Sequence, residues 1–296
     1  MDGRQTEFEC ADGVVLKGHW WGVEGAARHP VVIINPATGV KAAYYHRYAA
    51  FLAEHGFAVL TYDYRGIGLS RPAGRLKGTG FTWRQWGEQD FEAALAHALA
   101  QGGGDPLVVG HSIGGFLPGY APSAARISRL LTVGAQYAYW PDYRRKDRLS
   151  LFLKWHVAMP AITLALGFFP GRGLGWLEDL PAGVALEWSF RGPRMEARLK
   201  QPLRATILDR FAAVQAPMLA LSVSDDPFAT HSAVNRALSY YTSAERLKVM
   251  LEPADLGVTR VGHFDLFHAR HGSSFWIDSL LWLRDGINPW PRRVFA

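Results

Sequence analysis

The residue best suited to chemistry in this sequence is a serine set between two glycines. Residues 108–115 read as a short apolar strand signal followed at once by a Gly-x-Ser-x-Gly turn centred on Ser112. A serine on a sharp strand-to-helix turn is held in a strained backbone conformation, and larger side chains in place of Gly110 and Gly114 would collide with the turn. The free amides of a following helix favour negative charge beside the serine. The pattern predicts that Ser112 is a nucleophile.

A serine hydroxyl needs a base to remove its proton, and one histidine stands where that base belongs. His263 follows Gly262, after the apolar strand signal of residues 247–251 and before the last helix signal. No other histidine of the eleven follows the last strand so closely. His268 and His271 come next along the chain, and we interpret them as surface polar residues. The sequence therefore predicts His263 as the general base.

The base needs an acid that orients it, and two adjacent aspartates are candidates. Asp225 and Asp226 come directly after the strand signal of residues 218–223. Only one of two adjacent side chains can face the histidine, so we favour Asp226 and keep Asp225 as the alternative. The chain order Ser112, Asp226, His263 differs from the orders of the chymotrypsin and subtilisin triads.

An acyl-transfer intermediate also needs two donors for its oxyanion. The amide of Ile113, next after the nucleophile, supplies the first. The second should come from the loop of residues 35–39, which follows the strand signal of residues 31–34. Pro36 has no N–H and cannot donate. Ala37 or Thr38 can, and we favour Ala37.

Alternating strand and helix signals position these residues. Apolar strand runs recur at 31–34, 58–62, 107–109, 127–133, 218–223 and 247–251, with helix signals at 44–55, 86–100, 233–241 and 274–283. Residues 7–10 and 14–21 indicate an initial hairpin. This rhythm predicts an α/β fold with a mostly parallel sheet and helices on both faces.

The rhythm stops between residues 138 and 203. This segment shows helical pieces without strand signals and is rich in large aromatic side chains: Trp140, Phe152, Trp155, Phe168, Phe169, Trp176, Trp188 and Phe190. We interpret it as an insertion between a first core part, residues 1–137, and a second, residues 204–296.

Together these motifs resemble the α/β-hydrolase superfamily. The run Asp63-Tyr64-Arg65-Gly66-Ile67-Gly68-Leu69-Ser70 is similar to the Asp-x-Arg-Gly-x-Gly-x-Ser loop common in that family. With residues 110–115, 226–227 and 262–263 it resembles the serine aminopeptidase-like and monoglyceride-lipase-like branch. The resemblance implies that residues 138–203 form a helical cap (lid) over the active site. Large apolar surfaces on such a cap imply an apolar substrate pocket.

The sequence departs from the family pattern at two places. Asn35-Pro36 stands where the family has His-Gly in the oxyanion loop, and Val223 replaces the glycine usual before the acid. We regard Asp63 and Arg65 as loop scaffolding.

Composition excludes several other classes of protein. The chain has 296 residues, 49% of them hydrophobic, and a single cysteine, so an internal disulfide and a Cys-based metal cage are excluded. The formal charge is +6, but the basic residues are scattered without a nucleic-acid-binding motif, so no nucleic-acid partner is expected.

Residues 150–169 are apolar but contain Lys154, His156 and Pro160, so no stable membrane span is expected. The polar N-terminus lacks a secretory signal, and we expect a cytoplasmic protein of unknown oligomeric state.

The sequence thus predicts a serine hydrolase of carboxylic esters that needs no cofactor or metal. Its small-molecule substrate would be an apolar ester or acyl compound. The alternatives are an acyltransferase or a peptidase that uses the same triad, and a non-catalytic binding protein on the same fold.

Overall fold

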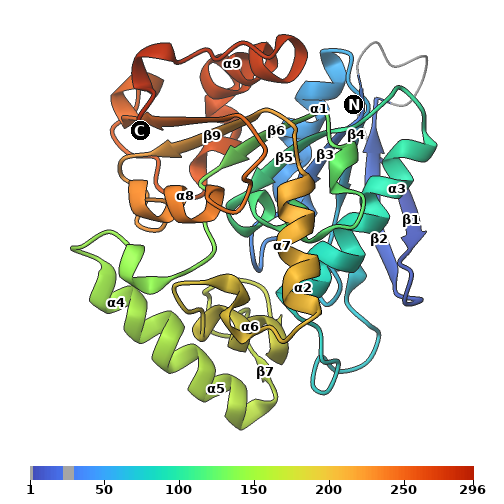
Figure 1. Ribbon diagram of the computed structural model, residues 1–296, viewed down its shortest axis with the longest axis vertical. Helices are drawn as coiled ribbons and strands as arrows, with labels where there is room; N and C mark the ends of the chain where they lie inside the picture. The colour runs from blue at the N-terminus through green and yellow to red at the C-terminus, as the bar shows by residue number, and fades with distance from the viewer. Residues whose placement is uncertain (1–2, 23–29) are drawn as a thin grey trace.

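The computed structural model describes residues 3–22 and 30–296. Its centre is an eight-stranded sheet with the strand order β1-β2-β4-β3-β5-β6-β9-β10 (Figure 1). The strands are β1 (Arg4–Glu9), β2 (Val15–Trp21), β3 (Val32–Asn35), β4 (Val59–Tyr62), β5 (Leu107–His111), β6 (Arg129–Val133), β9 (Met218–Val223) and β10 (Arg246–Leu251). β2 runs antiparallel to β1 and β4, and the strands from β4 to β10 are parallel. The predicted mostly parallel sheet is confirmed.

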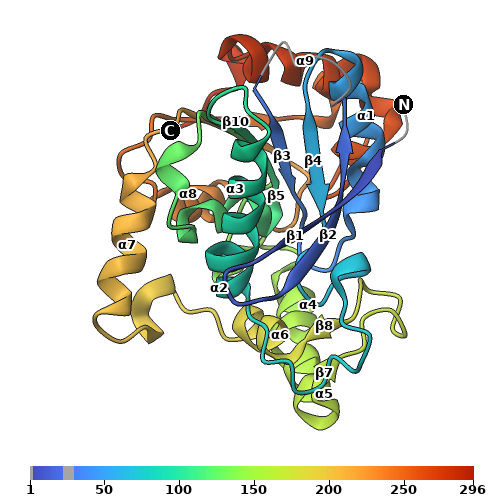
Figure 2. The same ribbon diagram turned by 90° about the vertical axis from the view of Figure 1, so that its right-hand side faces the viewer.

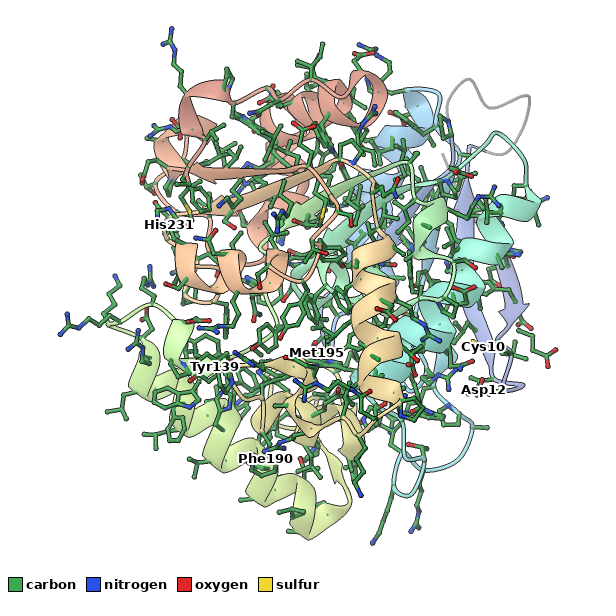
Figure 3. All side chains as sticks on the ribbon, in the orientation of Figure 1. Cys10, Asp12, Tyr139, Phe190, Met195 and His231 are labelled. Atoms are coloured by element: carbon green, nitrogen blue, oxygen red, sulfur yellow. The ribbon has the colours of Figure 1, made fainter. Side chains whose placement is uncertain are left out.

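Burial explains why the strand signals were continuous in the middle of the chain. Every residue of β3, β4, β5 and β9 is buried, because helices cover both faces of a parallel sheet. In β2 exposed and buried positions alternate along most of the strand, and in the edge strand β1 only Phe8 is buried. Figure 3 marks Cys10 and Asp12 at the turn of this hairpin, away from the inserted segment.

Helices divide the core between the two faces of the sheet. One cluster of buried side chains includes those of α1 (His46–Glu54) and α9 (Ile277–Leu280). The other includes those of α3 (Glu92–Ala100), α7 (Leu203–Ala213) and α8 (His231–Leu238). The short helix α2 (Trp83–Gln85) and a π-helical segment (Trp86–Phe91) lead into α3. This run begins earlier than the sequence predicted, because Thr82 and Gln85 form a reciprocal capping box at its start.

The inserted segment, residues 138–203, gathers at one end of the sheet (Figure 2). It holds α4 (Arg148–Phe152), a π-helical segment (Leu153–Ala158), α5 (Met159–Leu166) and α6 (Ala182–Ser189). Two very short strands, β7 (Phe168–Phe169) and β8 (Leu180–Pro181), pair with each other. The sequence predicted only helices here, since two-residue strands leave no periodic pattern to detect.

Candidate active site

The turn after β5 holds Ser112 in the conformation expected of a nucleophile. Its φ is 55°, one of only two positive values among the described residues that are not glycine. The expected crowding is present. A Cβ on Gly110 would lie 2.5 Å from the Gly114 carbonyl oxygen, and one on Gly114 would lie 2.4 Å from the Asn35 carbonyl oxygen. Both positions therefore require glycine, and they allow the chain to turn sharply at the serine.

The segment after the serine differs from the predicted helix. It forms two short 3₁₀ turns, Ser112–Gly115 and Leu117–Tyr120, instead of an α-helix. The reason is Pro118, which has no N–H to donate to the Gly114 carbonyl one α-turn earlier. That carbonyl accepts instead from the side-chain amide of Asn35, at 3.2 Å. The departure from the family pattern at Asn35 thus has a structural role.

His263 and Asp226 lie side by side in the loops that follow β10 and β9. His263 Nδ1 and Asp226 Oδ2 are 2.6 Å apart, and the other carboxylate oxygen accepts from the amides of Phe228 and Ala229 at 2.8 and 3.1 Å. Burial by itself raises the pKa of Asp226, but His263 and the two amides hold that pKa below its ordinary value. An ionised Asp226 fixes the proton of His263 on Nδ1, which leaves Nε2 free to act as a base.

Asp225, the alternative acid, faces another partner. Its carboxylate accepts from the amides of Val261 and Gly262, at 2.9 and 2.8 Å, so it fastens the loop that carries His263. Gly134 closes the far side of the His263–Asp226 pair with a φ of 60°. A Cβ at that position would lie 3.1 Å from both side chains. Backbone contacts from three directions therefore fix the orientation of the histidine.

A buried hydrogen-bond chain connects this loop to the loop after β3. His111 Nε2 lies 2.8 Å from the His263 carbonyl oxygen, and Nδ1 lies 2.7 Å from the Tyr45 hydroxyl. Burial and the neighbouring His263 lower the pKa of His111 to about 3, so its ring is neutral. Because a carbonyl can only accept, Nε2 carries the proton and Nδ1 accepts from Tyr45. The Tyr45 oxygen in turn accepts from the Ala37 amide at 3.0 Å.

These hydrogen bonds change the assignment of the second oxyanion donor. The Ala37 amide, which we favoured as the second donor, lines the cavity but donates to Tyr45. The Thr38 hydroxyl lines the same cavity and is buried without a hydrogen-bond partner among the described residues. The Ile113 amide has no recorded partner in the described chain either, and it too lies at the cavity.

Gln136 is a site residue that the sequence did not reveal. Its side-chain oxygen accepts from the Ala138 amide, which directs Nε2 to Ser112 Oγ at 3.4 Å. This is the only hydrogen bond of the serine hydroxyl among the described residues, and none joins it to His263. Both Ser112 and His263 line the same cavity. Catalytic hydrogen bonds are often long in the free enzyme and tighten when substrate binds.

The cavity has aromatic walls, half of which come from the inserted segment. It measures about 260 Å³, and its lining includes Trp83, Trp155, Trp176, Trp188, Phe228 and Phe264. The indole N–H groups of Trp83 and Trp155 are buried without a partner among the described residues. Lys154 Nζ lies 4.5 and 4.3 Å from the ring centres of Trp155 and Trp176, and burial lowers its pKa. No carboxylate side chain lines this cavity in the described part of the chain.

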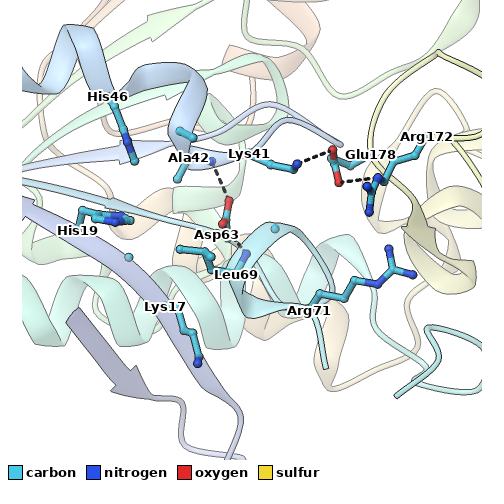
Figure 4. Close-up of a pocket in the computed structure, with 13 residues that line it drawn as sticks. Lys17, His19, Lys41, Ala42, His46, Asp63, Leu69, Arg71, Arg172 and Glu178 are labelled. Carbon is cyan, nitrogen blue, oxygen red and sulfur yellow. Dashed lines mark hydrogen bonds and ion pairs between the residues drawn. The ribbon is translucent and has the colours of Figure 1, made fainter. Parts of the chain in front are cut away.

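A second pocket lies beside the Asp63 loop (Figure 4). Asp63 accepts from the amides of Ala42 and Leu69, at 2.7 and 2.8 Å, and so joins two loops. Lys41 and Glu178 form an ion pair at 3.1 Å that ties the inserted segment to the core. These contacts agree with the scaffolding role inferred for Asp63.

Arg65 has a comparable role in the core. Its buried guanidinium forms ion pairs with Asp12 and Asp90. One inference from the sequence was wrong: His271 is fully buried and bonds Asp265 at 2.6 Å, whereas only His268 is exposed. Within residues 3–22 and 30–296, no group of three or more His, Cys, Asp or Glu side chains is placed to hold a metal ion.

One family model matches most of the chain. A family model described as "Alpha/beta hydrolase family" matches residues 31–273. The structure of DcsB in complex with its substrate analogue is 16% identical, with a TM-score of 0.63 over 97% of this chain and 100% of that chain.

Two esterase structures are similar as well. A Pyrococcus furiosus esterase is 14% identical, with a TM-score of 0.57 over 96% of this chain and 91% of its own. An esterase from Rhodococcus sp. is 16% identical, with a TM-score of 0.54 over 95% and 99%. At these identities the likeness shows the fold alone. No significant match is found among curated proteins.

Proposed function

Because the chain belongs to the alpha/beta hydrolase family, we propose that it is a serine hydrolase that cleaves carboxylic esters through an acyl-enzyme. One observation carries this proposal. Ser112, in its left-handed conformation, and His263, paired with Asp226 at 2.6 Å, line one aromatic cavity. Nucleophile, base and orienting acid are the groups that acyl transfer requires.

The proposed reaction proceeds in two halves. Ser112 Oγ attacks the ester carbonyl while His263 Nε2 takes its proton, and Asp226 stabilises the imidazolium that forms. The tetrahedral intermediate collapses when His263 returns the proton to the leaving alcohol, which gives the acyl-enzyme. A water molecule then attacks the acyl group with His263 again as base, and Ser112 is released. In this scheme no metal or organic cofactor takes part.

We propose that the oxyanion is bound by the Ile113 amide together with the Thr38 hydroxyl. The hydroxyl is buried at the cavity wall and has no hydrogen-bond partner among the described residues, so it can turn towards a developing charge at little cost. The Ala37 amide is the alternative second donor, and it would first have to give up its bond to Tyr45. Gln136 Nε2 holds the hydroxyl of Ser112 before substrate binds.

The cavity wall indicates the kind of acyl group. Its volume of about 260 Å³ lies near the lower end of small-molecule pockets, which run from roughly 300 Å³. Tryptophan and leucine side chains dominate the wall, so we propose an uncharged acyl chain of short to medium length. The inserted segment acts as a cap in this proposal. The motifs also lead us to place the chain in the serine aminopeptidase-like and monoglyceride-lipase-like branch.

A peptidase that binds a free amino terminus is less well supported. Such a subsite commonly uses carboxylates, and Glu178, Asp179 and Glu187 are the acidic candidates in the inserted segment. Each one is engaged elsewhere: Glu178 with Lys41, Asp179 with Arg71, and Glu187 with Arg191.

The test is hydrolysis of p-nitrophenyl esters of increasing acyl length by the wild type, two active-site variants and one control variant. We expect kcat/KM to rise with chain length and then fall once the cavity is full. Ser112→Ala and His263→Ala should each lower kcat by about 10⁴-fold. His268→Ala, at an exposed histidine nearby, is the matched control and should keep full activity. A folded Ser112→Ala protein that keeps a tenth of the wild-type rate would contradict the proposal, and a wild type without turnover would favour the binding-protein alternative.

A further inference from the structure

The long helix of the inserted segment presents an apolar face to solvent. It runs from Arg148 to Leu166 through α4, the π-helical segment and α5, and in Figure 1 it forms the outer edge of the segment. It is long and apolar enough to cross a membrane, yet only 28% of its most apolar window is buried. The exposed positions are Leu149, Ser150, Leu153, Val157, Ala161, Leu164, Ala165 and Leu166, all but one of them apolar. We call these eight residues the outer stripe.

The large side chains of the outer stripe are strongly exposed. Leu149 is 70% exposed, Leu164 68% and Leu153 51%. Leu149, Leu153 and Val157 are spaced four residues apart, so they follow one face of the helix. Single exposed leucines are common on protein surfaces, but a continuous row of them marks an interaction surface.

Ser150 is the one polar member of the outer stripe, whereas Lys154 and His156 turn away from it. Lys154 lies over Trp155 and Trp176 at the cavity. His156 is buried and makes hydrogen bonds to Tyr143 and to the Ser189 carbonyl. One face of the helix therefore lines the proposed active site, and the opposite face carries no charge. An inner face packed in this way keeps the helix on the protein, so it cannot span a bilayer.

Positive charge flanks the outer stripe at both ends. Arg145 and Lys146 precede the helix, are exposed, and have no ion pair among the described residues. At the other end the Lys77 side chain packs against Gly167. The sequence has no acidic residue between Asp147 and Glu178. An apolar stripe with cations at its ends fits the surface of an anionic bilayer, where leucines enter the acyl region and cations meet the head groups.

An open groove links this end of the helix to the catalytic histidine. Its lining includes Lys146 and Ser150 at the helix start and Phe228, His263 and Phe264 at the site. A substrate dissolved in a bilayer would therefore enter the groove where the helix touches the lipid.

We propose that the outer stripe docks the protein on the surface of an anionic lipid membrane, with the helix lying in the plane of the interface. The alternative partner for the outer stripe is a second copy of this protein. Two copies packed antiparallel on the stripe would bring Arg145 and Lys146 of one against Lys77 of the other, and like charges would oppose that contact. The charges therefore favour lipid. The proposal does not rest on catalysis, because binding is measured without turnover.

The test is sedimentation of the full chain with phospholipid vesicles. We expect the wild type to pellet with vesicles of equal parts phosphatidylglycerol and phosphatidylcholine, and to bind vesicles of phosphatidylcholine alone much more weakly. Leu149→Gln with Leu153→Gln should lower the partition coefficient by about tenfold or more, since two inserted leucines are lost. Ile287→Gln is the matched control, because Ile287 is 56% exposed and lies outside this helix. Neither set touches the proposed catalytic residues, so turnover of a soluble ester reports that each variant is folded.

Three results would overturn the proposal. The wild type could remain in the supernatant with anionic vesicles, or the double variant could pellet as well as the wild type. Sedimentation equilibrium could also show a dimer that the double variant abolishes, which would assign the outer stripe to a second copy. If the wild type binds the vesicles but hydrolyses no ester, that result contradicts the proposed function and leaves the membrane proposal standing.

Discussion

The Thr38 hydroxyl offers the sharpest separation of catalysis from stability in this protein. Thr38→Val removes the hydroxyl and keeps the shape of the side chain. In the free protein that hydroxyl is buried and has no partner in the described part of the chain, so the substitution breaks no hydrogen bond there. A buried hydroxyl without a partner costs roughly 1–3 kcal/mol, so the free energy of unfolding should stay the same or rise. If the hydroxyl binds the oxyanion, its loss should lower kcat by about 10²–10³-fold, or about 3–4 kcal/mol of transition-state stabilisation.

Two measurements on Thr38→Val and the wild type distinguish a catalytic role of the hydroxyl from a structural one. Urea unfolding gives the stability, and steady-state hydrolysis of p-nitrophenyl butyrate gives kcat and KM. We expect a large fall in kcat, little change in KM, and a midpoint of unfolding at or above that of the wild type. A kcat within threefold of the wild type would refute the role of the hydroxyl. The second oxyanion donor would then be assigned to a backbone amide. A fall in both kcat and stability would instead mean that Thr38 is structural.

Three further predictions follow from individual contacts. Tyr45→Phe leaves the Ala37 amide and His111 Nδ1 without partners in the core, so the free energy of unfolding should fall by about 2–4 kcal/mol in urea titrations. Asp226→Asn should lower kcat about 10⁴-fold. Because the folded pKa of Asp226 lies below that of the unfolded chain, the stability it adds is complete above the unfolded pKa and is lost as pH falls through the folded pKa. The difference in unfolding free energy between wild type and Asp226→Asn should therefore shrink as the pH is lowered from 6 towards 3. Lys154→Met keeps the apolar stem and removes an ammonium whose burial already lowers its pKa, so KM for uncharged octanoate esters should fall by roughly fivefold, or about 1 kcal/mol.

Each of these predictions has a contrary result. Unchanged stability of Tyr45→Phe would mean that the buried hydrogen-bond chain carries no net energy. If the difference in unfolding free energy between wild type and Asp226→Asn does not change with pH, the charge of Asp226 does not stabilise the folded protein. A higher KM for Lys154→Met with neutral esters would show that the lysine stacked on Trp155 and Trp176 helps to bind the acyl chain.

The sequence could predict the sheet and the placement of Ser112, because these depend on local patterns. Continuous β-branched runs indicated buried parallel strands, and the glycines at positions 110 and 114 indicated a sharp turn. The 3₁₀ turns after the serine were missed because Pro118 was not weighed as a break in the helix, and because the Asn35 side chain that then satisfies the Gly114 carbonyl lies far away in the chain.

Side chains that meet across the fold could not be predicted from spacing. Tyr45, at the end of a 3₁₀ helix, and Gln136, in the loop after β6, come from separate parts of the chain, and no local pattern distinguishes them from ordinary core residues. The inward turn of Lys154 depends on the π-helical segment, Leu153–Ala158, which changes the rotation per residue that a regular helix would have. His271 was assigned to the surface because its partner, Asp265, lies in an irregular turn.

The most direct test of the central claim is the intact mass of the protein after reaction with a fluorophosphonate. This reagent forms a covalent adduct only with a serine whose hydroxyl is activated by a base. We predict one adduct on the wild type, none on Ser112→Ala, and much slower labelling of His263→Ala. Labelling of Ser112→Ala at the wild-type rate, or no adduct on the folded wild type, would contradict the assignment of Ser112 as the nucleophile.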